Sequence, residues 1–208
     1  MRDPIAEASE ALASGQLVIF PTDTVYGLAA RPDDAVATRK LFLAKGRSED
    51  LAIPVLAGSV RDAHEVGEFD ERAELLAGAW PGKITLVLPR TAEALGWSLG
   101  GDGGTVGVRI PKHPLALALL ARTGPLAVTS ANRSGEPPLE DGDSLAAVFG
   151  DEVAVYLCQD APLSGAPSTV IDLTGPEPVI LRAGAFSATD IARFLDGEGP
   201  LLDSRPSP

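Results

Sequence analysis

The chain has 208 residues, a formal net charge of −12 and an apolar fraction of 45%. This length and composition predict one domain with a sizeable core over residues 1–196, followed by a flexible tail over residues 197–208. One cysteine and two histidines are too few for a disulfide framework or a metal site rich in Cys or His, so we expect no metal site built from side chains. No apolar run is long enough to span a membrane and no apolar signal core follows Met1, which predicts a cytoplasmic protein without membrane contact.

Capping residues, chain breakers and apolar periodicity predict an alternation of helices and strands. In chain order we expect a helix over 4–14, a strand over 17–20, a helix over 35–44, a strand over 53–56, a helix over 71–79, strands over 84–88 and 105–110, a helix over 114–122, a strand over 126–129, a helix over 144–149, strands over 153–157, 169–173 and 179–181, and a helix over 188–195. Pro54 favours a sheet edge or a bend, and Cys158 is expected in the core. The interleaving of helices with strand pairs predicts an α/β domain with a mixed sheet.

Polar side chains stand at the ends of two apolar strands, which is where small-molecule sites of α/β domains are built. Arg109 closes the strand over 105–110, so its guanidinium must reach solvent or find an anion. Thr105 shares a face of that strand with Arg109. Ser130 and Asn132 follow the strand over 126–129 and form either a turn or a ligand contact.

Two further segments carry chemistry-bearing residues. Lys45 and Arg47 flank a glycine after the helix over 35–44; they can converge on a polyphosphate or satisfy the last carbonyls of the helix. Thr24 and Tyr26 follow a buried strand, in a segment that can be a self-satisfied turn or a substrate contact. The sequence contains neither a Walker P-loop nor a nucleophile elbow, so we expect catalysis by positioning and charge stabilisation.

Taken in order, these segments resemble the YrdC/TsaC/Sua5 family, the threonylcarbamoyl-AMP synthases, from about Gly15 to Gly184. The resemblance implies a single YrdC-like domain in which a twisted mixed parallel/antiparallel sheet, flanked by helices, surrounds a concave cleft. It implies catalytic roles for Lys45 and Arg47, threonine binding by Thr24, Tyr26, Arg109, Ser130 and Ser168, and ATP binding by Lys45, Arg47, Thr105, Asn132 and Arg182. The segment over 48–53 and Lys83 depart from the family pattern.

The resemblance also implies a reaction. L-Threonine, bicarbonate and ATP, with Mg²⁺, would give L-threonylcarbamoyladenylate and pyrophosphate for the threonylcarbamoyladenosine modification of tRNA. A separate transferase complex would use the product, and the acidic chain itself would bind tRNA weakly or not at all. Two alternatives stay open: carbamoyl-adenylate chemistry on the same fold, and an RNA-binding module.

Overall fold

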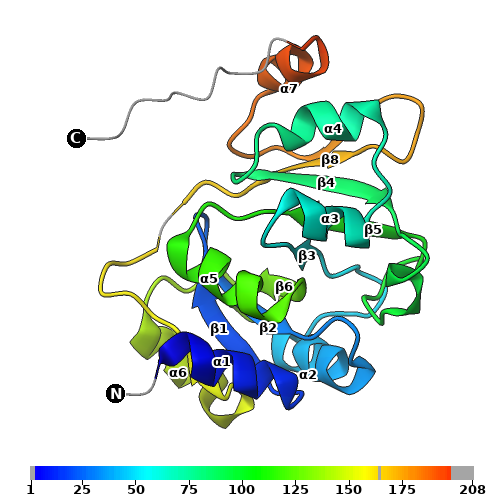
Figure 1. The fold of residues 1–208 in the computed structure, drawn as a ribbon. Helices are drawn as coiled ribbons and strands as arrows, with labels where there is room; N and C mark the ends of the chain where they lie inside the picture. Colours follow the sequence, from blue (N-terminus) through cyan, green and yellow to red (C-terminus); the bar gives the residue numbers. More distant parts are fainter. Residues whose placement is uncertain (1–2, 164, 198–208) are drawn as a thin grey trace.

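The computed structural model describes residues 3–163 and 165–197, which form one sheet with helices packed around it (Figure 1). The strand order is β7-β1-β2-β6-β3-β5-β4-β8-β9, with parallel and antiparallel neighbours, so the mixed sheet is confirmed. The strands are β1 (Val18–Pro21), β2 (Tyr26–Ala30), β3 (Val55–Leu56), β4 (Ile84–Pro89), β5 (Thr105–Arg109), β6 (Leu126–Ser130), β7 (Val155–Tyr156), β8 (Thr169–Asp172) and β9 (Val179–Arg182). Apart from Gly197, the predicted tail lies outside the described residues.

Helices begin at side-chain caps that the sequence signals clearly. Asp34 accepts hydrogen bonds from the N–H groups of Val36 and Ala37, and α2 ends at Gly46 in the left-handed region at φ 64°. The helices are α1 (Pro4–Ala13), α2 (Ala35–Lys45), α3 (Val60–Val66), α4 (Glu71–Ala77), α5 (Pro114–Thr123), α6 (Gly142–Phe149) and α7 (Ala188–Leu195), with short 3₁₀ turns η1 (Ala94–Gly96) and η2 (Gly150–Glu152). None of the helices in the described part of the chain has the length and apolarity that a membrane crossing requires.

Two elements were absent from the sequence prediction. β2 is buried along its whole length, so it shows no alternation of polar and apolar residues, and its Gly and Ala content does not favour a strand. α3 has seven residues after the Ser59 cap, which is too short for a clear helical period. The strand predicted over 153–157 shrinks to β7, and the expectation of a core Cys158 was wrong because this thiol is exposed beyond the strand end.

The prediction that Pro54 marks a sheet edge was also wrong. β3 pairs with β6 on one side and β5 on the other, so it lies inside the sheet. Pro54 precedes the paired residues, where its missing N–H breaks no ladder, and its carbonyl accepts from the N–H of Val128 at 2.9 Å.

The sheet brings three distant segments to one place. In Figure 1 the tip of the β1–β2 hairpin lies beside the end of β5 and beside the segment that enters β8. The approach is close, since a Cβ on Gly165 would lie 2.8 Å from the carbonyl oxygen of Thr24. α1 and α5 pack together over β1, β2 and β6 to form one core cluster, and α2, α3, α4, α6 and α7 contribute to a larger one. Polar residues at the hairpin tip therefore meet the end of β5 and the segment that precedes β8.

Candidate active site

The two threonines of the turn between β1 and β2 make different contacts: Thr22 bonds within the turn, and Thr24 also bonds to Arg109. The Thr22 hydroxyl closes the turn: it donates to the carbonyl of Val25 at 2.6 Å and accepts from the N–H groups of Thr24 and Val25. The Thr24 hydroxyl lies 3.0 Å from that of Thr22 and accepts from Nη1 of Arg109 at 3.1 Å. The interpretation as a self-satisfied turn is confirmed for Thr22, while the substrate contact of Thr24 stays a prediction.

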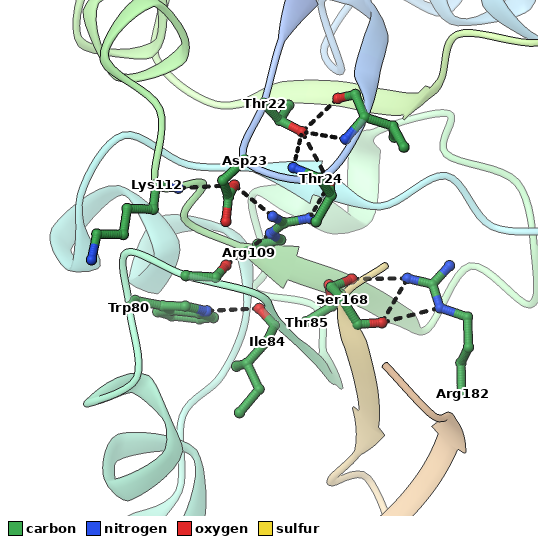
Figure 2. A network of polar contacts seen from close by, with 12 residues as sticks. Thr22, Asp23, Thr24, Trp80, Ile84, Thr85, Arg109, Lys112, Ser168 and Arg182 are labelled. Atoms are coloured by element: carbon green, nitrogen blue, oxygen red, sulfur yellow. Dashed lines mark hydrogen bonds and ion pairs between the residues drawn. The ribbon is translucent and has the colours of Figure 1, made fainter. Parts of the chain in front are cut away.

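Arg109 is 6% exposed, and its guanidinium finds an anion within the chain (Figure 2). Nη2 donates to Oδ1 of Asp23 at 2.6 Å, and Nε donates to the carbonyl of Gly82 at 2.9 Å. Burial lowers the pKa of Arg109, and the charge of Asp23 opposes that shift. The guanidinium is thus a fixed cation whose orientation is set by the hairpin tip and by the segment before β4.

Asp23 is a site residue that the sequence prediction did not include. Its Oδ1 also accepts from the main-chain N–H of Lys112 at 3.0 Å, while the Lys112 side chain extends away in Figure 2. Its Oδ2 is buried and has no hydrogen-bond partner among the described residues. A buried arginine that ends a strand requires a counter-charge, and this was the signal that could have pointed to Asp23.

Replacement of Asp23 by Asn should lower the free energy of unfolding by about 2 kcal/mol, because a charge-assisted bond to a buried guanidinium becomes a neutral one. Chemical denaturation followed by circular dichroism measures this loss. Asp3→Asn is the matched control: its ion pair with Arg122 joins side chains that are 57% and 51% exposed, and Asn caps α1 equally well. A loss for Asp23→Asn no larger than that of the control would contradict the buried pairing.

A second polar cluster lies where β8 meets β4 and β9 (Figure 2). The Ser168 hydroxyl is 2.9 Å from that of Thr85, and Nη2 of Arg182 donates to it at 2.8 Å. Arg182 also donates to the Ser168 carbonyl, and a Cβ on Gly184 would lie 2.5 Å from that carbonyl carbon. The charge of Arg182 contributes to the lowered pKa of Arg109, so the two guanidinium groups act on the same region.

Lys45, at the end of α2, is 4% exposed and is held by the loop after β6. Its Nζ donates to the carbonyl of Ser130 at 2.8 Å, to the Ser130 hydroxyl at 3.0 Å and to Oδ1 of Asn132 at 2.5 Å. These acceptors are neutral, and burial lowers the pKa of Lys45 to about 8, with a smaller contribution from the charge of Arg47. Lys45 therefore does not satisfy the last helical carbonyls, which was the alternative that the sequence left open.

The remaining predicted residues make other contacts. Arg47 donates to the carbonyls of Leu51 and Ala52, within the segment that departs from the family pattern. The Thr105 hydroxyl lies 3.2 Å from Oδ1 of Asp102. Tyr26 is fully buried, burial raises its pKa, and its hydroxyl accepts from the N–H of Gln159 at 3.2 Å. In the described structure, no hydrogen bond joins these three side chains to Arg109, to Arg182 or to Lys45.

The structure thus assembles three groups from the predicted residues: Thr24 with Arg109 at the hairpin tip, Ser168 with Arg182 where β8 meets β9, and Lys45 with Ser130 and Asn132 at the end of α2. A cavity of about 360 Å³ beside α2 contains none of the predicted site residues. Within the described residues, no three His, Cys, Asp or Glu side chains are placed to hold a metal ion.

The mixed α/β sheet thus carries a buried arginine at the end of β5 and a buried lysine at the end of α2, which is the architecture of α/β domains with a small-molecule site at the strand ends. The Sua5/YciO/YrdC family model, described as telomere recombination, matches residues 10–184. The chain belongs to this family.

Individual relatives agree with this assignment. A Mycobacterium tuberculosis protein that carries the name threonylcarbamoyl-AMP synthase is 44% identical over 193 residues, which cover 92% of this chain and 88% of the relative. The crystal structure of Pyrococcus abyssi Sua5 complexed with L-threonine matches with a TM-score of 0.81 and 36% identity, over 93% of this chain. This chain spans only 57% of that Sua5 chain. Escherichia coli YciO matches with a TM-score of 0.77 and 25% identity, over 88% of this chain and 90% of YciO.

Proposed function

We propose that this protein catalyses the ATP-dependent synthesis of L-threonylcarbamoyladenylate from L-threonine, bicarbonate and ATP, with release of pyrophosphate. The names of its relatives support this reaction. The structural observation that carries the proposal is the buried ammonium of Lys45, which is oriented by neutral acceptors only. Among the described residues no carboxylate pairs with it, so its charge is not neutralised; because its three N–H donors are all engaged, a phosphate would replace one of these neutral acceptors.

The hairpin tip supplies the proposed threonine site. A guanidinium has five N–H donors, and Arg109 directs one each to Gly82, Thr24 and Asp23, which leaves donors for the substrate carboxylate. Thr24, Ser130 and Ser168 would contribute hydroxyl groups, and the buried Tyr26 supports the wall of the site through its bond to the segment at Gln159. The residues of the proposed threonine site are therefore Thr24, Tyr26, Arg109, Ser130 and Ser168.

The chemical step is an adenylyl transfer. The nitrogen of threonine attacks carbon dioxide derived from bicarbonate to form a carbamate, and a carbamate oxygen then attacks the α-phosphorus of ATP while the bond to pyrophosphate breaks. The cations stabilise the charge that develops on the phosphates. The proposed ATP ligands are Lys45, Arg47, Thr105, Asn132 and Arg182, of which Lys45 and Arg47 act in catalysis. Mg²⁺ would enter on the phosphates of ATP and would neutralise part of their charge.

Product analysis tests the proposal. Purified protein with Mg²⁺, ATP, threonine and bicarbonate should release pyrophosphate and form an adenylate that contains threonine. Omission of threonine or bicarbonate should abolish pyrophosphate release. Release at an unchanged rate without threonine would contradict the proposal.

The adenylate would pass to a separate threonylcarbamoyl transferase complex that acts on tRNA in the cytoplasm. Tight tRNA binding needs several phosphate contacts, and the chain carries a net charge of −12. We therefore expect weak tRNA binding by the isolated protein at physiological salt, and an adenylate yield that is unchanged by tRNA. A mobility-shift titration measures the binding, and a submicromolar, salt-sensitive complex would revive an RNA-binding function.

The pKa of Lys45 predicts how ATP binding changes with pH. An ordinary lysine titrates at 10.5 and Lys45 at about 8, so the ammonium that binds phosphate is lost as the pH rises through about 8. A bound phosphate raises this pKa, and binding of Mg²⁺-ATP at pH 8 should take up about half a proton. Calorimetry in buffers of different ionisation enthalpy measures the uptake. Lys45→Met should take up none; equal uptake by this variant would contradict the assignment.

A further inference from the structure

The loop after β6, residues 131–135, is hydrogen-bonded to the C-terminal turn of α2. The last carbonyls of a helix have no partner within it, and here two consecutive ones are satisfied from outside. The Arg133 guanidinium donates to the carbonyl of Ala44, and the N–H of Ser134 donates to that of Lys45 at 2.7 Å. The same loop carries Asn132, which accepts from the Lys45 ammonium. One loop therefore holds both the main chain and the charged end of Lys45.

Arg133 is itself anchored in α6 and η2. Its Nη2 donates to the carbonyl of Val148 at 2.9 Å and to Oε1 of Glu152 at 2.5 Å. Its guanidinium lies 5.0 Å from the centroid of the Phe149 ring, which is buried. The bond to Glu152 raises the pKa of Arg133, so the guanidinium stays charged. Through these contacts the end of α2 is tied to α6.

We propose that Arg133 is a positioning residue that holds the Lys45 ammonium against Ser130 and Asn132, so that it meets the substrate phosphates in one fixed orientation. The inference rests on the proposed function, which gives Lys45 a phosphate to bind. Arg133 does not contact the Lys45 ammonium, and Glu152 neutralises its charge. Removal of Arg133 alone leaves the Glu152 carboxylate unpaired, whereas Arg133→Ala combined with Glu152→Gln removes both charges and changes position without a change of net charge.

Loss of the bonds that Arg133 makes to α2 and α6 has a measurable consequence at Lys45. The groups that face its ammonium are the neutral Ser130 and Asn132 from the loop and the charged Arg47 from its own segment. Burial is the main cause of its lowered pKa. A loosened loop admits water to the ammonium, and the pKa of Lys45 should then rise toward its ordinary value.

Titration of ¹³C-labelled lysines by NMR tests the proposal without reference to catalysis. The lysines of the chain are Lys40, Lys45, Lys83 and Lys112, and the Lys45→Met variant assigns the Lys45 resonance. Arg133→Ala combined with Glu152→Gln, which leaves no unpaired charge, should raise the titration midpoint of Lys45 by one pH unit or more. Arg133→Lys should not restore it, because a single ammonium lacks the planar fork that reaches several acceptors. Arg122→Ala, which breaks an exposed ion pair, is the matched control and should leave the midpoint in place.

Glu152→Gln is a milder variant that keeps an acceptor for Arg133 and serves if the double variant does not fold. Loss of the carboxylate alone would lower the pKa of Lys45, so the smaller upward shift expected here reports a change of position. An unchanged Lys45 midpoint in the folded variants would overturn the proposal. A raised midpoint should be accompanied by an increase in the KM for ATP of about tenfold in Arg133→Ala. A raised midpoint with unchanged ATP kinetics would leave the positioning role intact and contradict the phosphate role of Lys45, so the two hypotheses fail separately.

Discussion

Lys45→Met is expected to reduce kcat/KM for ATP-dependent pyrophosphate release by about 10²–10³-fold. Loss of one preoriented donor to a developing charge has this magnitude in other enzymes, and Lys45 is a buried cation whose ammonium is oriented by three acceptors. Methionine has a similar length and no charge, so the change removes the ammonium with little change in packing. Steady-state kinetics with a coupled pyrophosphate assay measure the effect.

Lys40→Met is the matched control for this variant. Lys40 lies on the same helix, and its ammonium donates to the carbonyl of Gly15, away from the candidate site. Its replacement should leave kcat/KM within about twofold of the parent protein, since it removes an exposed surface contact. A folded Lys45→Met protein that retains full activity would show that the ammonium has no role in the chemical step.

The order of most elements could be predicted from the sequence because their signals are local. Asp34 and Gly46 mark the two ends of α2, and apolar runs mark the strands that flank the candidate site. β2 was missed because a strand buried on both faces lacks alternation, so the pairing of β1 with β2 was not foreseen. The error at Pro54 had a different cause: the neighbours of a two-residue strand are set by tertiary contacts, which the local sequence does not show.

The residues of the candidate site could be named from their motifs, but their partners could not. Asp23 and Arg109 are 86 positions apart, and Lys45 and Asn132 are 87 positions apart. No local pattern encodes such a contact. What the sequence did provide was a constraint: a buried guanidinium must have an acceptor or an anion, and the structure supplies both from the hairpin tip and Gly82.

Arg109→Gln is expected to have the largest effect on stability and to abolish threonine binding. Removal of one partner from a buried ion pair costs about 3–5 kcal/mol, and here it leaves the Asp23 carboxylate buried without its cation. The second variant, Asp23→Asn with Arg109→Gln, removes both charges and should recover most of the free energy of unfolding, because two amides can share a hydrogen bond without a buried charge.

The double variant separates the two roles of Arg109. It should unfold at nearly the same denaturant concentration as the parent protein, yet calorimetry should detect no threonine binding, because the guanidinium proposed to receive the substrate carboxylate is gone. Asp3→Asn with Arg122→Gln removes an exposed pair and is the matched control, which should bind threonine as the parent does. If the stable double variant binds threonine with parental affinity, Arg109 serves only to hold the hairpin tip against β5, and another cation must receive the carboxylate. Arg182, which shares the same region and donates to Ser168, would then be the residue to replace next.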